Sequence, residues 1–141
     1  MGSLEGMRVL DMTQYEAGTS CTQMLAWLGA DVVKVEPPTG DPGRGVGRDL
    51  SDDPERERQY FMNYNSNKRS IVLNLKSDEG RQLLLDMAPN YDVFVENYGP
   101  GVVEKLGLNY ELLSTINPKL IHARIKGFGL SGPYAAYNCY D

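Results

Sequence analysis

The stretch Leu28-Gly29-Ala30-Asp31-Val32-Val33-Lys34-Val35-Glu36 joins the end of a predicted helix to a predicted buried strand. Apolar side chains at helical spacing precede it and predict a helix over residues 17–28, with a core face of Cys21, Met24, Leu25 and Leu28. Gly29 suits the left-handed position at which many helices end. Residues 31–36 are mostly apolar and β-branched, as in a strand of a parallel sheet that is covered on both faces.

The same alternation continues through the chain. Further strands are predicted over residues 6–11, 70–75, 91–96 and 119–126, and further helices over 101–106, 110–116 and from the N-cap Ser77 onward, with an apolar face of Leu83, Leu84 and Met87. Residues 37–60 are rich in Pro and Gly and predict a long irregular loop, with a helical turn within 53–58. Alternating strands and helices predict an α/β fold with a mainly parallel sheet flanked by helices.

The last predicted strand differs from the others because its side chains alternate. Ile121, Ala123 and Ile125 face one way, and His122, Arg124 and Lys126 face the other. One of its faces is therefore expected to be exposed to solvent or covered by something that this chain lacks. We expect a structural role for His122.

Composition narrows the functional class. The chain has 141 residues and a formal net charge of -5, which predicts one domain and no nucleic-acid partner. It has no apolar run of about 18 residues and no signal-peptide pattern, so we expect a cytoplasmic protein without a membrane partner. One His and two distant Cys, Cys21 and Cys139, predict no metal site and two free thiols. Cys21, Met24 and Trp27 are expected in the core.

Ligands of open α/β sheets bind outside the carboxyl ends of the strands. The segment after the first strand lacks the Gly-x-Gly-x-x-Gly pattern of dinucleotide-binding proteins, although Glu36 occupies the place of a ribose-binding acid. A P-loop and a Gly-x-Ser-x-Gly elbow are also absent from the sequence. The turn from Glu96 to Gly101 offers the Asn97 amide, the Tyr98 ring, two glycines and a following helix, which suit a phosphorylated, purine-containing ligand.

Several segments in fixed order resemble the class III coenzyme A (CoA) transferases, the family of formyl-CoA transferase and carnitine CoA transferase. They are Leu4–Asp11, Ala17-Gly18, Leu28–Glu36, Asn67–Ser70, Asp92–Gly101, Leu106-Gly107, Asn117–Ile121 and Gly127–Gly129. The resemblance implies a Rossmann-like large domain that binds CoA, of which residues 1–141 would be the N-terminal part, without the rest of that domain and the small domain. It also implies a homodimer or larger assembly.

The resemblance implies transfer of CoA between carboxylic acids, with acyl-CoA as substrate and no metal. In that family an aspartate carboxylate attacks the acyl-CoA thioester, and the CoA thiolate leaves. The thiolate then opens the resulting anhydride to give an enzyme–CoA thioester and the free acid, and an acceptor acid takes the CoA by the reverse steps. The resemblance places this aspartate beyond Asp141, so this chain alone is expected to be inactive.

Positions carried over from the family give supporting catalytic residues and CoA contacts. Glu16 and Asp141 would support catalysis, although Glu16 stands where formyl-CoA transferase has glutamine, and Lys105 replaces an arginine. A lysine still pairs with phosphate, but without the bidentate fork of arginine. The implied CoA contacts are Glu16, Ala17, Leu73, Asn74, Leu75, Lys76, Asn97, Tyr98, Gly99, Lys105, Asn138, Cys139, Tyr140 and Asp141.

Two other functions stay open on the sequence. The chain could be a non-catalytic module that folds, assembles and binds CoA or a partner. It could also be a relative of the α-methylacyl-CoA racemases, which share the family fold and abstract a proton next to the thioester. The carboxylate at Glu16 keeps this second alternative open. Its position at the start of the first helix would also allow Glu16 to cap that helix.

Overall fold

The computed structural model describes residues 2–47 and 58–139. Its strands form one sheet in the order β3-β2-β1-β4-β5, and each of the four strand pairings is parallel. The strands are β1 (Arg8–Met12), β2 (Asp31–Glu36), β3 (Arg69–Val72), β4 (Val93–Glu96) and β5 (Ile121–Arg124). The predicted α/β fold with a parallel sheet flanked by helices is confirmed.

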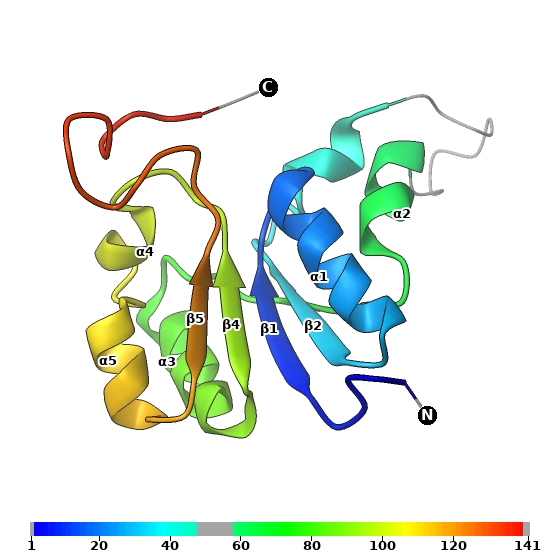
Figure 1. Ribbon diagram of the computed structural model, residues 1–141, viewed down its shortest axis with the longest axis horizontal. Helices are drawn as coiled ribbons and strands as arrows, with labels where there is room; N and C mark the ends of the chain where they lie inside the picture. Colours follow the sequence, from blue (N-terminus) through cyan, green and yellow to red (C-terminus); the bar gives the residue numbers. More distant parts are fainter. Residues whose placement is uncertain (1, 48–57, 140–141) are drawn as a thin grey trace.

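Helices cover both faces of the sheet (Figure 1). Helices α1 (Ala17–Trp27) and α2 (Gln59–Asn65) lie on one face, and α3 (Asp78–Met87), α4 (Val102–Lys105) and α5 (Tyr110–Ile116) lie on the other. Two short 3-10 helices, η1 (Pro42–Gly45) and η2 (Ala88–Asn90), belong to the connections. No helix in the described ranges has the length and apolar character needed to span a membrane.

Strands β1 and β4 are neighbours in the sheet although β2 and β3 lie between them in the sequence. Val9 pairs with Val93 and Met12 with Glu96 across this junction. The chain leaves β1 toward the face of α1, and the next segments cross to the opposite face before β4 begins (Figure 1). The junction is a topological switch point, which is where a ligand crevice forms in sheets of this kind.

The hydrophobic core has two parts. The larger part lies against α3, α4 and α5 and includes Leu10, Phe94, Leu84, Val103 and Leu113. The smaller part lies against α1 and is built from small side chains, namely Val9, Ala26, Ala30, Val32, Val93 and Val95. The rest of the space between α1 and the sheet is filled by polar residues.

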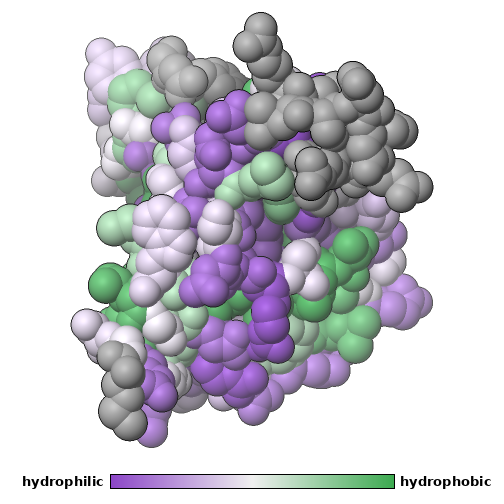
Figure 2. Space-filling view, turned by 90° about the vertical axis from the view of Figure 1, so that its right-hand side faces the viewer, coloured by the Kyte–Doolittle hydropathy of each residue, from purple (hydrophilic) through white to green (hydrophobic). Residues whose placement is uncertain are grey.

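Helix α1 turns its polar side toward the sheet, so its predicted orientation is wrong. Thr19, Thr22 and Gln23 are buried, whereas Cys21 is exposed and Met24 and Trp27 are 53% and 60% exposed. Figure 2 looks onto the face of α1 and α2, where hydrophilic residues run down the middle and hydrophobic residues lie on either side. The inward threonines satisfy buried charges, and leaving such charges unsatisfied would cost more than exposing apolar side chains.

Two further expectations differ from the structure. The predicted loop over residues 37–60 contains η1 and the start of α2, a seven-residue helix that buries only Phe61 and therefore has no apolar repeat in the sequence. The helical turn expected over residues 53–58 falls, except for Arg58, outside the described residues. Of the predicted apolar face of α3, Leu84 is buried and Met87 packs against the core, whereas Leu83 is 54% exposed.

Other local expectations are confirmed. Gly29 has a positive φ of 105° directly after α1, and the Ser77 hydroxyl caps α3 by accepting from the Gly80 N–H at 3.1 Å. The polar side of β5 is covered by this chain itself: the His122 ring lies 5.0 Å from the Phe94 ring and 6.3 Å from that of Tyr110. The exposed part of β5 is Ile121, on the other side.

Candidate functional site

A cavity of about 450 Å³ opens at the carboxyl ends of β4 and β5. Its walls are the turn 97–101 after β4, residues 124–130 at the end of β5, and the segment 135–139, and Ala17 adds the start of α1. In Figure 1 the last of these segments curls over the carboxyl ends of the strands above α4. Through Ala17 and the turn 97–101, the cavity borders the switch point between β1 and β4, where the fold predicts a ligand.

The Asn97 amide joins the two loops that flank the switch point. Its Oδ1 accepts from the Gln14 N–H at 2.8 Å, and its Nδ2 donates to the Gln14 carbonyl at 2.8 Å. The side chain therefore pairs with a backbone as a neighbouring strand would. One donor and one acceptor of the amide are used in this way, so Asn97 shapes the cavity wall by holding the loop after β1.

Tyr98 is tied to the same loop through its phenol. The Gln14 Nε2 donates to the Tyr98 hydroxyl at 2.9 Å, and the ring packs against the larger core. Burial raises the pKa of Tyr98, the Gln14 hydrogen bond lowers it, and the charges of Asp41, Asp11 and Glu96 raise it further, to about 12 in all. The phenol therefore stays protonated at neutral pH and does not serve as a base there.

A buried ion cluster lies beneath the same turn. Glu96, which has no exposed surface, accepts from the Tyr98 N–H at 2.9 Å and pairs with Lys126 at 2.7 Å and Arg124 at 3.1 Å. Arg124 also pairs with Glu104 of α4 at 2.5 Å. Two carboxylates thus balance the two cations that line the cavity, because paired charges are the form in which ions are tolerated inside proteins.

Two glycines allow the loops around the cavity to approach closely. A Cβ on Gly18 would lie 2.4 Å from the Thr13 Cγ2 and 3.2 Å from the Asn97 side chain. A Cβ on Gly99 would lie 2.9 Å from the Asn138 Oδ1. Larger residues at these positions would push the walls of the cavity apart.

Aromatic rings form the outer wall. Phe128 lies 5.6 Å from Tyr134 and 6.4 Å from Tyr137, measured between ring centroids, and Tyr134 and Tyr137 are 5.6 Å apart. Phe128 and Tyr137 line the cavity, and all three rings are more than 40% exposed. Exposed rings beside a cavity offer faces for stacking with a planar ligand group.

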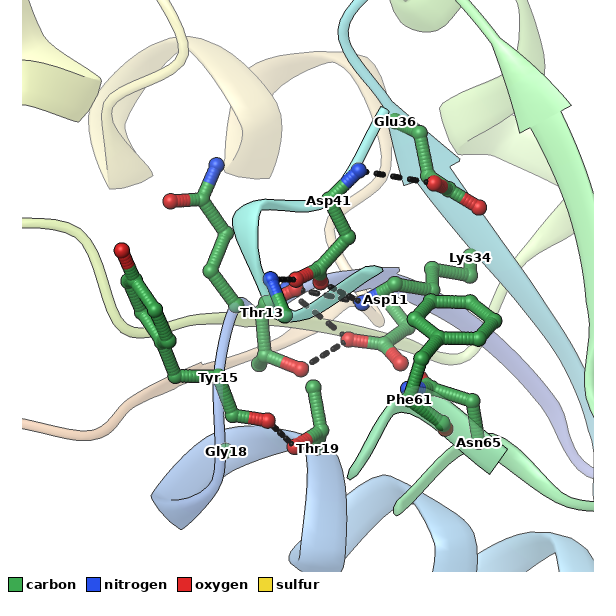
Figure 3. A network of polar contacts seen from close by, with 12 residues as sticks. Asp11, Thr13, Tyr15, Gly18, Thr19, Lys34, Glu36, Asp41, Phe61 and Asn65 are labelled. Atoms are coloured by element: carbon green, nitrogen blue, oxygen red, sulfur yellow. Dashed lines mark hydrogen bonds and ion pairs between the residues drawn. The ribbon is translucent and has the colours of Figure 1, made fainter. Parts of the chain in front are cut away.

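A second polar cluster holds the loop after β1 in place (Figure 3). Asp11 is fully buried and accepts from the Thr13 N–H at 2.9 Å, the Thr13 hydroxyl at 2.5 Å and the Thr22 hydroxyl at 2.7 Å. Lys68 pairs with Asp11 at 3.0 Å and donates to the Thr19 carbonyl at 2.9 Å. The cluster therefore binds β1, α1 and the segment before β3 to one another.

Lys34 completes this cluster from β2. Its ammonium donates to the Thr13 carbonyl at 2.7 Å and pairs with Asp41 at 2.7 Å, and both side chains are buried. The backbone of Thr13 is thus held by Asp11 at its N–H and by Lys34 at its carbonyl. Since Thr13 leads into Gln14, the cluster fixes the loop to which Asn97 is attached.

Glu36 has no free carboxylate oxygen for a ribose. It is paired with Arg44 at 2.7 Å and accepts from the Ser70 hydroxyl at 2.5 Å and the Asp41 N–H at 2.9 Å. Burial raises the pKa of Glu36, but the hydrogen bonds from Arg44, Ser70 and Asp41 and the charge of Arg44 outweigh it and lower the pKa from 4.5 to about 2. Because the Glu36 carboxylate is already fully hydrogen-bonded and the glycine pattern is missing, binding of a nicotinamide dinucleotide is disfavoured.

We expect the Glu36–Arg44 pair to stabilise the fold in a pH-dependent way. The folded-state pKa lies below the unfolded one, so the contribution is present above about pH 4.5 and is lost as the pH falls toward 2. Arg44→Met should lower the free energy of unfolding by about 2 kcal/mol at pH 7 and by much less at pH 2.5. Urea unfolding across this pH range measures the difference in the free energy of unfolding. Arg69→Met is the control, because Arg69 pairs with Asp31 at an exposed site. A constant difference would contradict the pairing.

The structure brings some of the predicted CoA contacts together and separates others. Six of them line the cavity: Ala17, Asn97, Tyr98, Gly99, Asn138 and Cys139. Residues 73–76 follow β3, which is separated from β4 by β2 and β1, and Lys105 is exposed on α4; neither lines the cavity. Glu16 is exposed at the N-cap of α1, and its side chain does not cap the helix. Tyr140 and Asp141 lie outside the described residues.

Most of the residues that line the cavity were absent from the predicted site, among them Arg124, Lys126, Phe128 and Tyr137. The alternation of β5 and the glycine-rich segment after it were both visible in the sequence. What the sequence does not show is that β5 lies next to β4, so that its cations meet the carboxylate of Glu96. In the described part of the chain, no group of three or more His, Cys, Asp or Glu side chains is arranged to hold a metal ion.

The fold and the cavity define an α/β protein with a ligand site at the switch point of a parallel sheet. The model of CoA-transferase family III matches residues 4–141, and the chain belongs to this family. It is 51% identical to a formyl-CoA:oxalate CoA-transferase of Streptomyces coelicolor over 139 residues and 48% identical to one of Bradyrhizobium over 140. These alignments cover 99% of this chain but 33% and 32% of the relatives, so the chain spans about a third of their length.

Solved structures agree with this assignment. A CAIB/BAIF family protein from Brucella suis superposes with a TM-score of 0.93 at 42% identity, over 99% of this chain and 37% of that one. A hypothetical protein from Mycobacterium tuberculosis superposes with a TM-score of 0.90 at 38% identity, over 100% of this chain and 38% of the other. The family assignment therefore rests on both sequence and fold.

Proposed function

We propose that the cavity at the ends of β4 and β5 binds the CoA part of an acyl-CoA. The protein would supply the CoA site of a transferase that moves CoA between carboxylic acids, and residues 1–141 would form the N-terminal part of its large domain. The observation that carries the proposal is the turn 97–99, the CoA contact implied by the family, in the wall of this cavity. Neither cysteine forms a disulfide, which supports a cytoplasmic location.

The chemistry of the cavity suits the parts of CoA. Exposed rings at Phe128 and Tyr137 offer stacking faces to an adenine, and Gly99 and Gly101 allow a phosphate to approach the backbone closely. The lining cations Arg124 and Lys126 are balanced by Glu96 and Glu104, so the wall does not repel an anion strongly. These groups favour binding by shape and stacking as much as by charge.

The described residues offer the cavity no nucleophilic carboxylate. Glu104 is the only carboxylate among the lining residues of the described part, and it pairs with Arg124. Glu96 lies beneath the wall and accepts from three donors. We therefore propose that the attacking aspartate follows Asp141 in the complete protein. This chain by itself would bind CoA without transferring it, which is the non-catalytic alternative in its simplest form.

Calorimetric titration of this 141-residue chain with free CoA tests the proposed function. We expect saturable binding, no CoA transfer between acids, and about fivefold weaker binding for Lys105→Ala, because the charge of Lys105 attracts the phosphates of CoA from outside the cavity. Lys119→Ala, which changes an exposed lysine two residues before the start of β5, is the matched control and should leave the affinity unchanged. No binding at millimolar CoA would contradict the proposal.

We also propose that the protein assembles into a homodimer or a larger oligomer. The support is the outward face of α1, where Met24, Trp27 and Leu28 are about half exposed and the buried threonines prevent the helix from turning them inward. Light scattering should show a species larger than a monomer, and Trp27→Glu should shift it toward the monomer. The exposed Val72→Glu, on β3, serves as control. A wild-type protein that stays monomeric at high concentration would contradict assembly.

A further inference from the structure

Lys126 and Glu96 together hold the backbone of Tyr98, Glu96 at its N–H and Lys126 at its carbonyl. The Glu96 Oε2 accepts from the Tyr98 N–H at 2.9 Å, and the Lys126 Nζ donates to the Tyr98 carbonyl at 2.5 Å. The two charged groups are themselves paired at 2.7 Å. One ion pair therefore fixes the two peptide groups that flank Tyr98 in the cavity wall.

Tyr98 stands at a point where the backbone has little intrinsic order. Gly99, Pro100 and Gly101 follow it, and Gly101 has a positive φ of 76°. A segment with two glycines has many accessible conformations, and fixing one of them costs conformational entropy. The next residue, Gly99, also has to keep its close approach to Asn138 on the opposite wall. An external clamp on Tyr98 supplies the restraint that the turn itself lacks.

A buried ion pair is a weak device for stability alone, because the desolvation of two charges offsets their attraction. Arg124 shows the difference within the same cluster. It pairs with the same Glu96 but has no hydrogen bond to Tyr98, so it stabilises the carboxylate without orienting the peptide. Only Lys126 among the two cations connects the buried charge to the ligand-facing turn.

We propose that Lys126 is a positioning residue, which acts with Glu96 to hold the turn 97–99 in the conformation that binds CoA. This inference rests on the proposed function of the cavity. It assigns Lys126 a role through the backbone of Tyr98 and not through direct contact with the ligand. Neither the sequence pattern nor the carried-over CoA contacts pointed to this residue.

The test compares three variants of the whole chain by amide hydrogen exchange and by CoA titration. Lys126→Met should raise the exchange rate of the Tyr98 N–H about tenfold and weaken CoA binding roughly fivefold to twentyfold. Lys126→Arg keeps a cation and donors, and should restore most of both properties. Arg124→Met removes the other cation on Glu96 and should leave Tyr98 exchange within about twofold of the wild type. If Lys126→Met does not fold, Lys126→Gln takes its place.

The outcomes separate positioning from the alternatives. Weaker binding with unchanged exchange at Tyr98 would show that Lys126 contacts the ligand directly, and would overturn the proposal. Faster exchange with unchanged affinity would show that the ligand does not use the turn, and would also overturn it. A wild-type chain that binds no CoA would instead overturn the proposed function. A wild type that binds CoA and a Lys126→Met variant that binds equally well would overturn only the positioning role.

Discussion

Asp11→Ala is expected to lower the free energy of unfolding by about 3–5 kcal/mol, because it leaves a buried lysine without its carboxylate. The Lys68 ammonium is 2% exposed, and the Asp11 carboxylate is its only described anionic partner. Burial lowers the pKa of Lys68, Asp11 raises it, and the nearby Lys34 lowers it. Without Asp11, the pKa of Lys68 falls further, and keeping a charged lysine buried destabilises the folded state. Urea unfolding at pH 7 measures the effect.

Asp31→Ala is the matched control for this prediction. Asp31 also pairs with a cation, Arg69, but both side chains of that pair are well exposed. Exposed pairs contribute about 0–1 kcal/mol, so the control should lose no more than that. Similar losses in the two variants would mean that the cluster beneath α1 is solvated, and would remove the explanation for the reversed orientation of that helix.

Asn97→Ala is expected to weaken CoA binding at least tenfold and to lower the free energy of unfolding by about 2 kcal/mol. The substitution removes both hydrogen bonds to the Gln14 backbone and so separates the loop after β1 from the turn after β4. The Gln14 N–H and carbonyl would lose their partners near the cavity wall. Calorimetric titration and urea unfolding measure the two effects on the same protein.

Asn74→Ala provides the comparison for Asn97. Asn74 belongs to the other group of implied CoA contacts, is exposed after β3, and does not line the cavity. We expect its affinity for CoA to stay within about twofold of the wild type. A greater loss of affinity at Asn74 than at Asn97 would place the ligand at the end of β3 and not at the switch point.

The sequence predicts the elements of this fold better than their orientation. The strand over residues 31–36 and the helix over 110–116 have the predicted bounds, because their apolar runs and caps are local features. The orientation of α1 was wrong, since it depends on Asp11 and Lys68, and Lys68 lies 57 residues from Asp11 in the sequence. Hydrophobic spacing alone does not anticipate a helix that is held by buried polar contacts.

The site shows the same limit. The segment after β4 was identified from Asn97, Tyr98 and the glycines, and it does line the cavity. The roles of the side chains differ from the expectation, because the Asn97 amide and the Tyr98 phenol are used by Gln14. Those contacts depend on β1 and β4 being neighbours, and this strand order is a property of the whole sheet. The local sequence does not predict which strands pair in this way.

The central claim is that the ligand binds in the cavity at the ends of β4 and β5, beside the switch point and the loops that Asn97 joins. Titration of the ¹⁵N-labelled chain with CoA, followed by amide chemical shifts, tests it most directly. We predict the largest shift changes at residues 97–101 and 127–130 and at Asn138, with small changes at residues 73–76. Large changes confined to residues 73–76 and Lys105, or none anywhere at saturating CoA, would contradict the assignment.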